Sequence, residues 1–267
     1  MLGNSLLSYD LQLGLRYEDW KKRCLHKMPE WLEALGRIEM LISYGTFAFN
    51  HPAYCFPQPV DELVLKADAM GHPLIREGER INNNVCMGAN QPVVLITGSN
   101  MSGKSTWLRT LGINVLLAQS GAPVCATAME WKPMLVLSSL RQSDSLYENT
   151  SLFMNELKQL QYILEKASGE TEALVLLDEV LRGTNSEDKY AGSLALLKRL
   201  SGCKGFAVVA SHDLKLSKLE NEADSKIVNY CFESRIENGH LHFDYTLRKG
   251  VAVNRNATWL MQQMGIV

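Results

Sequence analysis

The stretch Val93-Val-Leu-Ile-Thr-Gly-Ser-Asn-Met-Ser-Gly-Lys-Ser105 decides the fold. Its first five residues form the apolar run of a buried strand, and its last eight match the pattern G-x-x-x-x-G-K-[ST] in full. A helical run over Ser105–Gln119 follows. This order of strand, glycine-rich loop and helix is the context that a phosphate-binding loop requires. A chance glycine-rich turn is the alternative, and the flanking strand and helix disfavour it.

The residue types in the loop suit nucleotide phosphates. Glycines let successive backbone N–H groups point at phosphate oxygens, and the next helix adds its positive N-terminal end. We expect Lys104 to neutralise the β- and γ-phosphates and the Ser105 hydroxyl to ligate Mg²⁺. ATP and Mg²⁺ are therefore the predicted cofactors. The predicted nucleotide-binding residues of the loop are Gly98, Ser99, Asn100, Met101, Ser102, Gly103, Lys104, Ser105 and Thr106.

A second motif, Leu174-Val-Leu-Leu-Asp178-Glu179, ends a buried strand in two carboxylates. A parallel strand delivers such groups to the ligand edge of its sheet. We expect Asp178 to hold the Mg²⁺ shell and Glu179 to orient or deprotonate the attacking water. Alone, this pattern is often a strand that enters a surface turn; after a phosphate-binding loop it favours catalysis.

A histidine follows a third predicted strand, Phe206–Ala210. Ser211-His212 then faces the same edge of the sheet, where His212 can donate a hydrogen bond to the γ-phosphate or the attacking water. The alternative is a polar residue that caps the next helix. The predicted catalytic residues are therefore Glu179, His212 and Lys104.

Short apolar strands alternate with helices from Glu62 onward, which predicts an α/β domain with a sheet flanked by helices. Before it, Trp31, Leu35, Ile38 and Ile42 have the spacing of one apolar helix face. We predict a helical segment at residues 1–60, with Pro57-Gln-Pro59 as a linker, and a nucleotide-binding domain at 61–267. Further helices are expected near 6–24, 152–166, 190–200 and 214–221, and further strands at 63–67, 134–140, 227–234 and 242–247.

Composition narrows the class of protein. The 46% hydrophobic and 21% charged fractions are those of a globular protein, with no apolar run long enough to span a bilayer. The six cysteines contain no C-x-x-C pair and fit reduced thiols, so we expect a cytoplasmic protein. The net charge of −2 provides no global attraction to nucleic acid.

The motifs together resemble one family, the MutS ATPases, which belong to the ABC-type group of P-loop proteins. The resemblance rests on the loop Gly98–Thr106 with its Asn-Met centre, on Ser151-Leu-Phe-Met-Asn-Glu156, on Asp178-Glu-Val-Leu-Arg-Gly-Thr184 and on Ser211-His212. It spans about residues 63–267, and the helical segment before it is similar to the end of the family's lever region.

The resemblance implies further contacts and partners. Two ATPase domains of this family face each other, which implies a homodimer in which Ser151 touches the γ-phosphate of the partner subunit; a plain helix N-cap is the alternative. It also implies that Ile81 packs on adenine. Asn149 and Leu181 stand where the family usually has glycine. The chain contains no mismatch-reading, connector or clamp region, so DNA is expected to bind through regions absent from it.

Three readings follow from these residues. The first is the ATP-hydrolysing domain of a MutS-like DNA repair or DNA-processing protein that acts as a nucleotide-gated dimer. The second is a nucleotide-gated interaction module with little turnover, which Asn149 and Leu181 motivate. The third, an ABC transporter or chromosome-organising ATPase, is disfavoured because the chain has no LSGGQ-like signature.

Overall fold

A computed structural model describes residues 8–140, 152–237 and 240–253 of the chain. Contacts divide the chain into two units, Met1–Pro52 and Ala53–Val267, which are described separately. The first unit consists of helices. Their bounds are α2 (Tyr9–Cys24), the 3₁₀ turn η1 (Leu25–Lys27) and α3 (Met28–Asn50).

The helices of the first unit contain no buried residue among those described. The apolar stripe predicted from the sequence lies on α3, and its members Trp31, Leu35, Ile38 and Ile42 are each at least half exposed. Two helices without a companion sheet cannot bury such a stripe themselves. No helix in the described ranges combines the length and apolarity needed to cross a membrane.

The second unit is built on a six-stranded sheet in the order β10-β9-β4-β8-β7-β6 within the described residues. All neighbouring strands are parallel except β9 and β10, which form an antiparallel pair. The central strand β4 is buried along its whole length, as are β7 and β8. The bounds are β4 (Val93–Thr97), β6 (Leu135–Ser139), β7 (Ala173–Asp178), β8 (Gly205–Ser211), β9 (Ile227–Glu237) and β10 (His240–Lys249).

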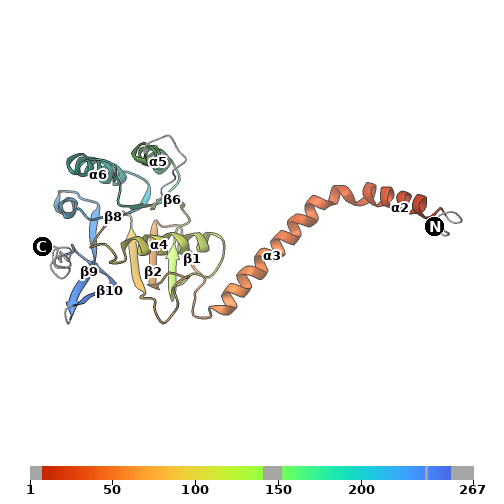
Figure 1. Cartoon of the computed structure of the whole chain (residues 1–267), viewed down its shortest axis with the longest axis horizontal. Helices are drawn as coiled ribbons and strands as arrows, with labels where there is room; N and C mark the ends of the chain where they lie inside the picture. The colour runs from red at the N-terminus through yellow and green to blue at the C-terminus, as the bar shows by residue number, and fades with distance from the viewer. Residues whose placement is uncertain (1–7, 141–151, 238–239, 254–267) are drawn as a thin grey trace. The chain divides into compact units, whose positions relative to one another are not determined.

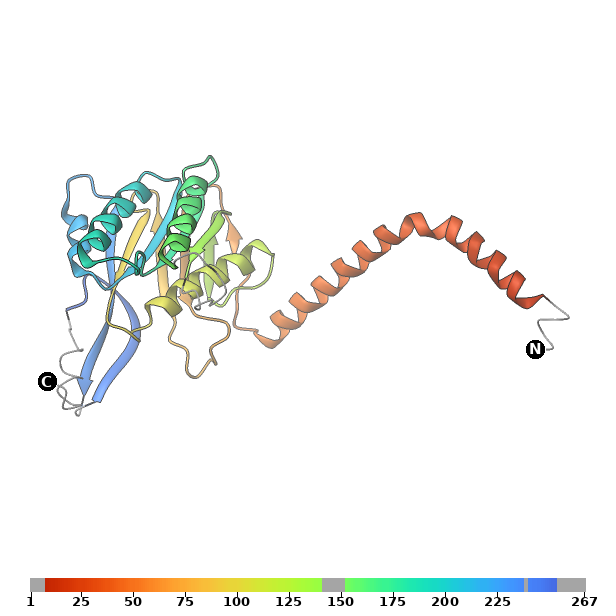
Figure 2. The ribbon, with the colours of Figure 1, turned by 45° about the horizontal axis from the view of Figure 1, so that its top comes forward.

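Helices cover both faces of this sheet (Figures 1 and 2). Val94 and Ile96 of β4 pack into one core with α4, whereas Val93 and Leu95 pack into a second core with α5, α6 and η2. Successive side chains of a strand point to opposite faces, so a strand buried on both faces is apolar throughout. The bounds are α4 (Lys104–Gln119), α5 (Leu152–Ala167), α6 (Ser186–Leu200) and the 3₁₀ helix η2 (Leu214–Asn221).

Helix α4 lies between two sheets. One side contacts the six-stranded sheet so closely that a Cβ on Gly112 would be 2.9 Å from Leu176 Cδ1. On the other side, residues such as Trp107 share a core with Leu65 and Met129 of a four-stranded sheet, in the order β1-β5-β2-β3. Burial on two sides leaves α4 only a narrow exposed stripe, formed by Thr106, Arg109, Leu116 and Gln119. The bounds are β1 (Gln58–Pro59), β2 (Val64–Met70), β3 (Asn83–Gly88) and β5 (Ala128–Trp131).

The structure confirms the predicted α/β class and corrects the linker. Gln58-Pro59 is a strand that pairs with β5, and Val60 N donates to Trp131 O at 2.9 Å. Proline is tolerated there because β1 is an edge strand, where a missing N–H costs little. Two further strands, β3 and β5, are absent from the prediction because their buried side chains alternate with exposed ones in short segments.

Candidate nucleotide-binding site

The phosphate-binding loop connects β4 to α4, as the sequence predicts. Gly103 has φ 109° and Met101 has φ 65°, so the loop turns through the left-handed region. At Gly98 a Cβ would lie 2.7 Å from both Phe232 O and Ser102 Oγ, which leaves room only for glycine. The loop curls tightly and opens onto the first turn of α4, the position where a phosphate binds to a helix N-terminus.

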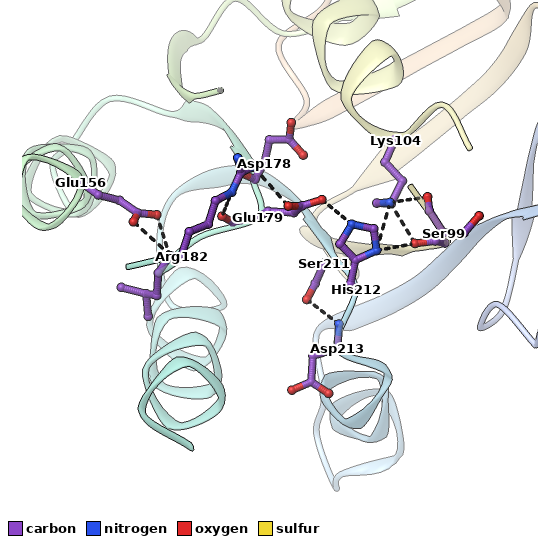
Figure 3. Close-up of polar contacts among 11 residues, drawn as sticks. Ser99, Lys104, Glu156, Asp178, Glu179, Arg182, Ser211, His212 and Asp213 are labelled. Carbon is purple, nitrogen blue, oxygen red and sulfur yellow. Dashed lines mark hydrogen bonds and ion pairs between the residues drawn. The ribbon is translucent and has the colours of Figure 1, made fainter. Parts of the chain in front are cut away.

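Lys104, the first residue of α4, is 4% exposed. Its Nζ donates hydrogen bonds to Gly98 O at 2.9 Å and Ser99 O at 2.8 Å, as Figure 3 shows. The ammonium group is therefore held inside the loop, against the backbone carbonyls of Gly98 and Ser99.

Two buried polar groups beside the loop have no hydrogen-bond partner in the described part of the chain. They are the Ser102 hydroxyl and both carboxylate oxygens of Asp178. Asp178 ends β7 and is 5% exposed, and a buried charge without a partner is costly unless it is paired or coordinates a metal. The residues therefore fit Mg²⁺ and a phosphate: Asp178 and Ser105 offer oxygen ligands, and Ser102 offers a donor.

Glu179 and His212 meet at the ends of β7 and β8. His212 Nε2 contacts Glu179 Oε1, while Nδ1 lies 2.8 Å from Gly98 O. Both ring nitrogens lie beside oxygen acceptors, so each is placed to donate a hydrogen bond when it carries a proton. Lys104 Nζ lies 3.5 Å from Nδ1, and both nitrogens lie within hydrogen-bond distance of Gly98 O.

The hydrogen bond from His212 lowers the pKa of Glu179 from 4.5 to about 2. The positive charges of His212 and Arg182 lower it further, against the opposing effect of burial. Glu179 is thus a fully ionised carboxylate at neutral pH. While it is paired with His212 it is also a weak base.

A cavity of about 600 Å³ adjoins the loop, within the size range of small-ligand sites. Ile81, predicted to pack on adenine, lines it with its side chain 49% exposed. His72 lines it as well, and burial lowers the pKa of His72, with a smaller contribution from the charge of Arg109. The imidazole of His72 is therefore uncharged at neutral pH.

Comparison with known proteins agrees with this geometry. The family model for MutS domain V matches residues 94–261.

The chain belongs to the MutS family.

MutS protein homolog 4 of Mus musculus is 30% identical over 238 residues, which are 88% of this chain and 23% of that protein. The DNA mismatch repair protein MutS of Natronomonas pharaonis is 32% identical over 231 residues, which are 85% of this chain and 26% of that protein. The DNA mismatch repair protein MutS of Aquifex pyrophilus is 30% identical over 255 residues, which are 92% of this chain and 28% of that protein. The chain thus spans about a quarter of the length of these MutS relatives.

Tyr245 is a cavity residue of this MutS-family chain that the sequence analysis missed. It lies in β10, where the pairing with β9 is irregular between Phe243 and Leu247, and has φ 51°. A Cβ on Gly103 would be 3.1 Å from Tyr245 Cδ1, so the ring lies against the phosphate-binding loop. Asn83 fixes this segment by donating to Tyr245 O at 3.0 Å and accepting from Leu247 N at 2.7 Å. An irregular ladder leaves no sequence signal.

Arg182 belongs to the motif Asp178–Thr184 that carries the resemblance, but its contacts within the MutS-family site were not predicted. Its Nε donates to Glu179 O at 2.8 Å and its Nη2 to Asp178 O at 2.9 Å. Nη2 also lies 3.3 Å from Glu179 Oε2. The guanidinium therefore folds the loop after β7 back on itself and contacts the carboxylate that the sequence predicts to be catalytic.

The predicted signature residues lie outside the described residues. Ser151 and Asn149 both belong to the range 141–151. The contact predicted between Ser151 and the partner subunit of a MutS dimer stays a prediction.

Proposed function

We propose that this chain is the ATP-binding and hydrolysing domain of a MutS-like DNA repair or DNA-processing protein. The observation that carries the proposal is the buried carboxylate of Asp178, unpartnered among the described residues, beside a complete phosphate-binding loop. Two of the relatives named above are DNA mismatch repair proteins, which supports repair as the setting.

Binding is assigned to the loop and its neighbours. Lys104 holds the β- and γ-phosphates, and its two hydrogen bonds to loop carbonyls keep the ammonium at the right place. Ile81 and Tyr245 line the cavity, where Ile81 would pack on the adenine. Ser105 and Asp178 would hold Mg²⁺, which would neutralise the negative charge that develops on the phosphate oxygens.

Hydrolysis is assigned to Glu179 and His212. In the nucleotide-free site His212 donates to Glu179, and the pKa of about 2 makes this carboxylate a poor base. When His212 turns its Nε2–H toward a γ-phosphate, Glu179 loses the contact that most lowers its pKa. Glu179 is then free to orient and deprotonate the attacking water. The ion pair thus keeps the base inactive until substrate arrives.

Dimerisation would complete the site and transmit its state. We propose a cytoplasmic homodimer joined through the ATPase faces, with Ser151 reaching the partner's γ-phosphate and DNA bound by regions outside this chain. Residues 1–60 would form the end of a lever, and the exposed apolar stripe on α3 suits packing against other regions of the protein. The free thiols support a reducing compartment.

A nucleotide-gated module with little turnover is the second candidate. Leu181 has φ 59° where the family usually has glycine, and Glu179 is held by both His212 and Arg182. A slow release of Glu179 from these contacts would give tight ATP binding with slow hydrolysis.

ATP hydrolysis measured against protein concentration tests both candidates. We expect a specific activity that rises with concentration, is lost in Glu179→Gln and is retained in Glu170→Gln, an exposed control. ATP binding, measured by titration, should survive in all three proteins. Tight binding without hydrolysis by the wild type would favour the gated module, and no ATP binding at all would refute both.

A further inference from the structure

The loop that follows β7 has a strained backbone at Glu179, the predicted catalytic base, and at Leu181. Glu179 has φ 53° and Leu181 has φ 59°, both in the left-handed region that residues with a Cβ seldom adopt. Such conformations persist only where the surroundings over-determine them. The contacts that hold this loop therefore decide where the Glu179 carboxylate points.

The strongest of these contacts comes from α5. Glu156 Oε1 accepts a hydrogen bond from Leu181 N at 2.6 Å, and Oε2 accepts one from Arg182 N at 3.2 Å (Figure 3). A carboxylate that accepts two successive backbone N–H groups makes charge-assisted bonds, which are shorter and stronger than neutral ones. One turn earlier on α5, Phe153 packs against the same loop, since a Cβ on Gly183 would lie 2.7 Å from Phe153 Cβ.

The same loop reaches the predicted base. Arg182, whose N–H is held by Glu156, bonds through its guanidinium to the Glu179 carbonyl and lies 3.3 Å from the Glu179 carboxylate. A continuous path of contacts therefore runs from Glu156 through the backbone and side chain of Arg182 to Glu179. Glu156 is not among the residues that line the nucleotide cavity, so its effect is indirect.

We infer that Glu156 is a positioning residue for ATP hydrolysis. It holds the strained Leu181–Arg182 backbone and thereby fixes the orientation of Glu179. This inference rests on the proposed ATPase function. Because Glu156 contacts the loop after β7 and does not line the nucleotide cavity, its loss lowers kcat and leaves ATP affinity unchanged. A residue that merely supported the fold would lower both together with stability.

A graded series of variants tests this role in the full chain. Glu156→Gln keeps the shape and one acceptor, whereas Glu156→Ala removes both. We expect kcat to fall about tenfold in the first and about 100-fold in the second, the loss typical of a misplaced catalytic group. The KM for ATP and the melting temperature of Glu156→Gln should stay near the wild-type values. Glu165→Gln, an exposed acid on the same helix, is the control and should retain full kcat.

A double-variant cycle and hydrogen exchange separate the possible outcomes. Combined with Arg182→Ala, Glu156→Ala should add little further loss, since both act along one path. Wild-type kcat in Glu156→Ala, or a parallel loss of ATP affinity in Glu156→Gln, overturns the inference. If the wild type hydrolyses no ATP, the proposed function fails, and the backbone amides of Leu181 and Arg182 still decide the positioning role: faster exchange in Glu156→Ala supports it, and unchanged exchange overturns it.

Discussion

Replacement of Asp178 by asparagine should stabilise the protein in a metal chelator and abolish its ATPase activity. Asp178 is 5% exposed, and neither of its carboxylate oxygens has a hydrogen-bond partner among the described residues. A buried carboxylate whose oxygens have no hydrogen-bond partner destabilises the folded state, and asparagine has nearly the same shape without the carboxylate. We expect the free energy of unfolding to rise by about 1–3 kcal/mol. A gain of about 2 kcal/mol corresponds to roughly 4–8 °C in a domain of this size.

Thermal melts in EDTA and in Mg²⁺ with ATP provide the assay. In EDTA, Asp178→Asn should melt above the wild type, whereas Mg²⁺ and ATP should raise the melting temperature of the wild type only. Asp61→Asn, an exposed carboxylate, is the control and should change stability by no more than about 0.5 kcal/mol. An Asp178→Asn protein that melts below the wild type in EDTA would refute the reasoning, because the carboxylate would then be stabilising without a cation.

Three further outcomes are expected. The folded-state pKa of Glu179 is about 2 and lies below its ordinary 4.5, so the contact with His212 stabilises the fold above pH 4.5 and is lost as the pH falls through about 2. In urea unfolding, the loss of stability caused by His212→Ala should therefore shrink over this pH range. A loss of stability that stays constant with pH would contradict the pairing. Gly205→Ala should cost several kcal/mol of unfolding free energy, because its Cβ would lie 2.1 Å from a β7 carbonyl oxygen, whereas Gly250→Ala, with a similar φ of 118° and open space, should cost about 1 kcal/mol. Lys104→Met should weaken nucleotide binding at least tenfold in a fluorescence titration, and unchanged affinity would remove it from the site.

The sequence predicts the interior of the six-stranded sheet better than its surroundings. β4, β7 and β8 are buried on both faces, so each is an unbroken apolar run that is bounded by glycine or polar residues. β3 and β5 bury only alternate residues in short segments, and their pattern is too brief to separate from loop sequence. β1 contains a proline and pairs over two residues, which no local pattern indicates.

The candidate site also contains some residues that the sequence predicts and others that it does not. Asp178 and His212 come at or just after the carboxyl end of a predicted strand, and Lys104 follows a third one through the phosphate-binding loop. Parallel topology therefore brings all three to one edge of the sheet. Their catalytic and binding roles stay predictions. The contacts of Arg182 and Glu156 depend on left-handed residues in the loop after β7, a conformation that the leucine side chain at position 181 disfavours. Strain of this kind is fixed by the surrounding structure and leaves no local trace in the sequence.

The central strand has a consequence for how the second unit unfolds. Val93 and Leu95 belong to one hydrophobic core, and Val94 and Ile96 belong to the other. If one core unfolds, β4 loses the contacts on one of its faces. The side chains of β4 that the other core needs are then no longer held in place. The two cores should therefore lose structure in one cooperative transition, with a calorimetric enthalpy equal to the van't Hoff enthalpy. A fragment that lacked α5, α6 and η2 would leave one face of β4 bare and should not fold alone.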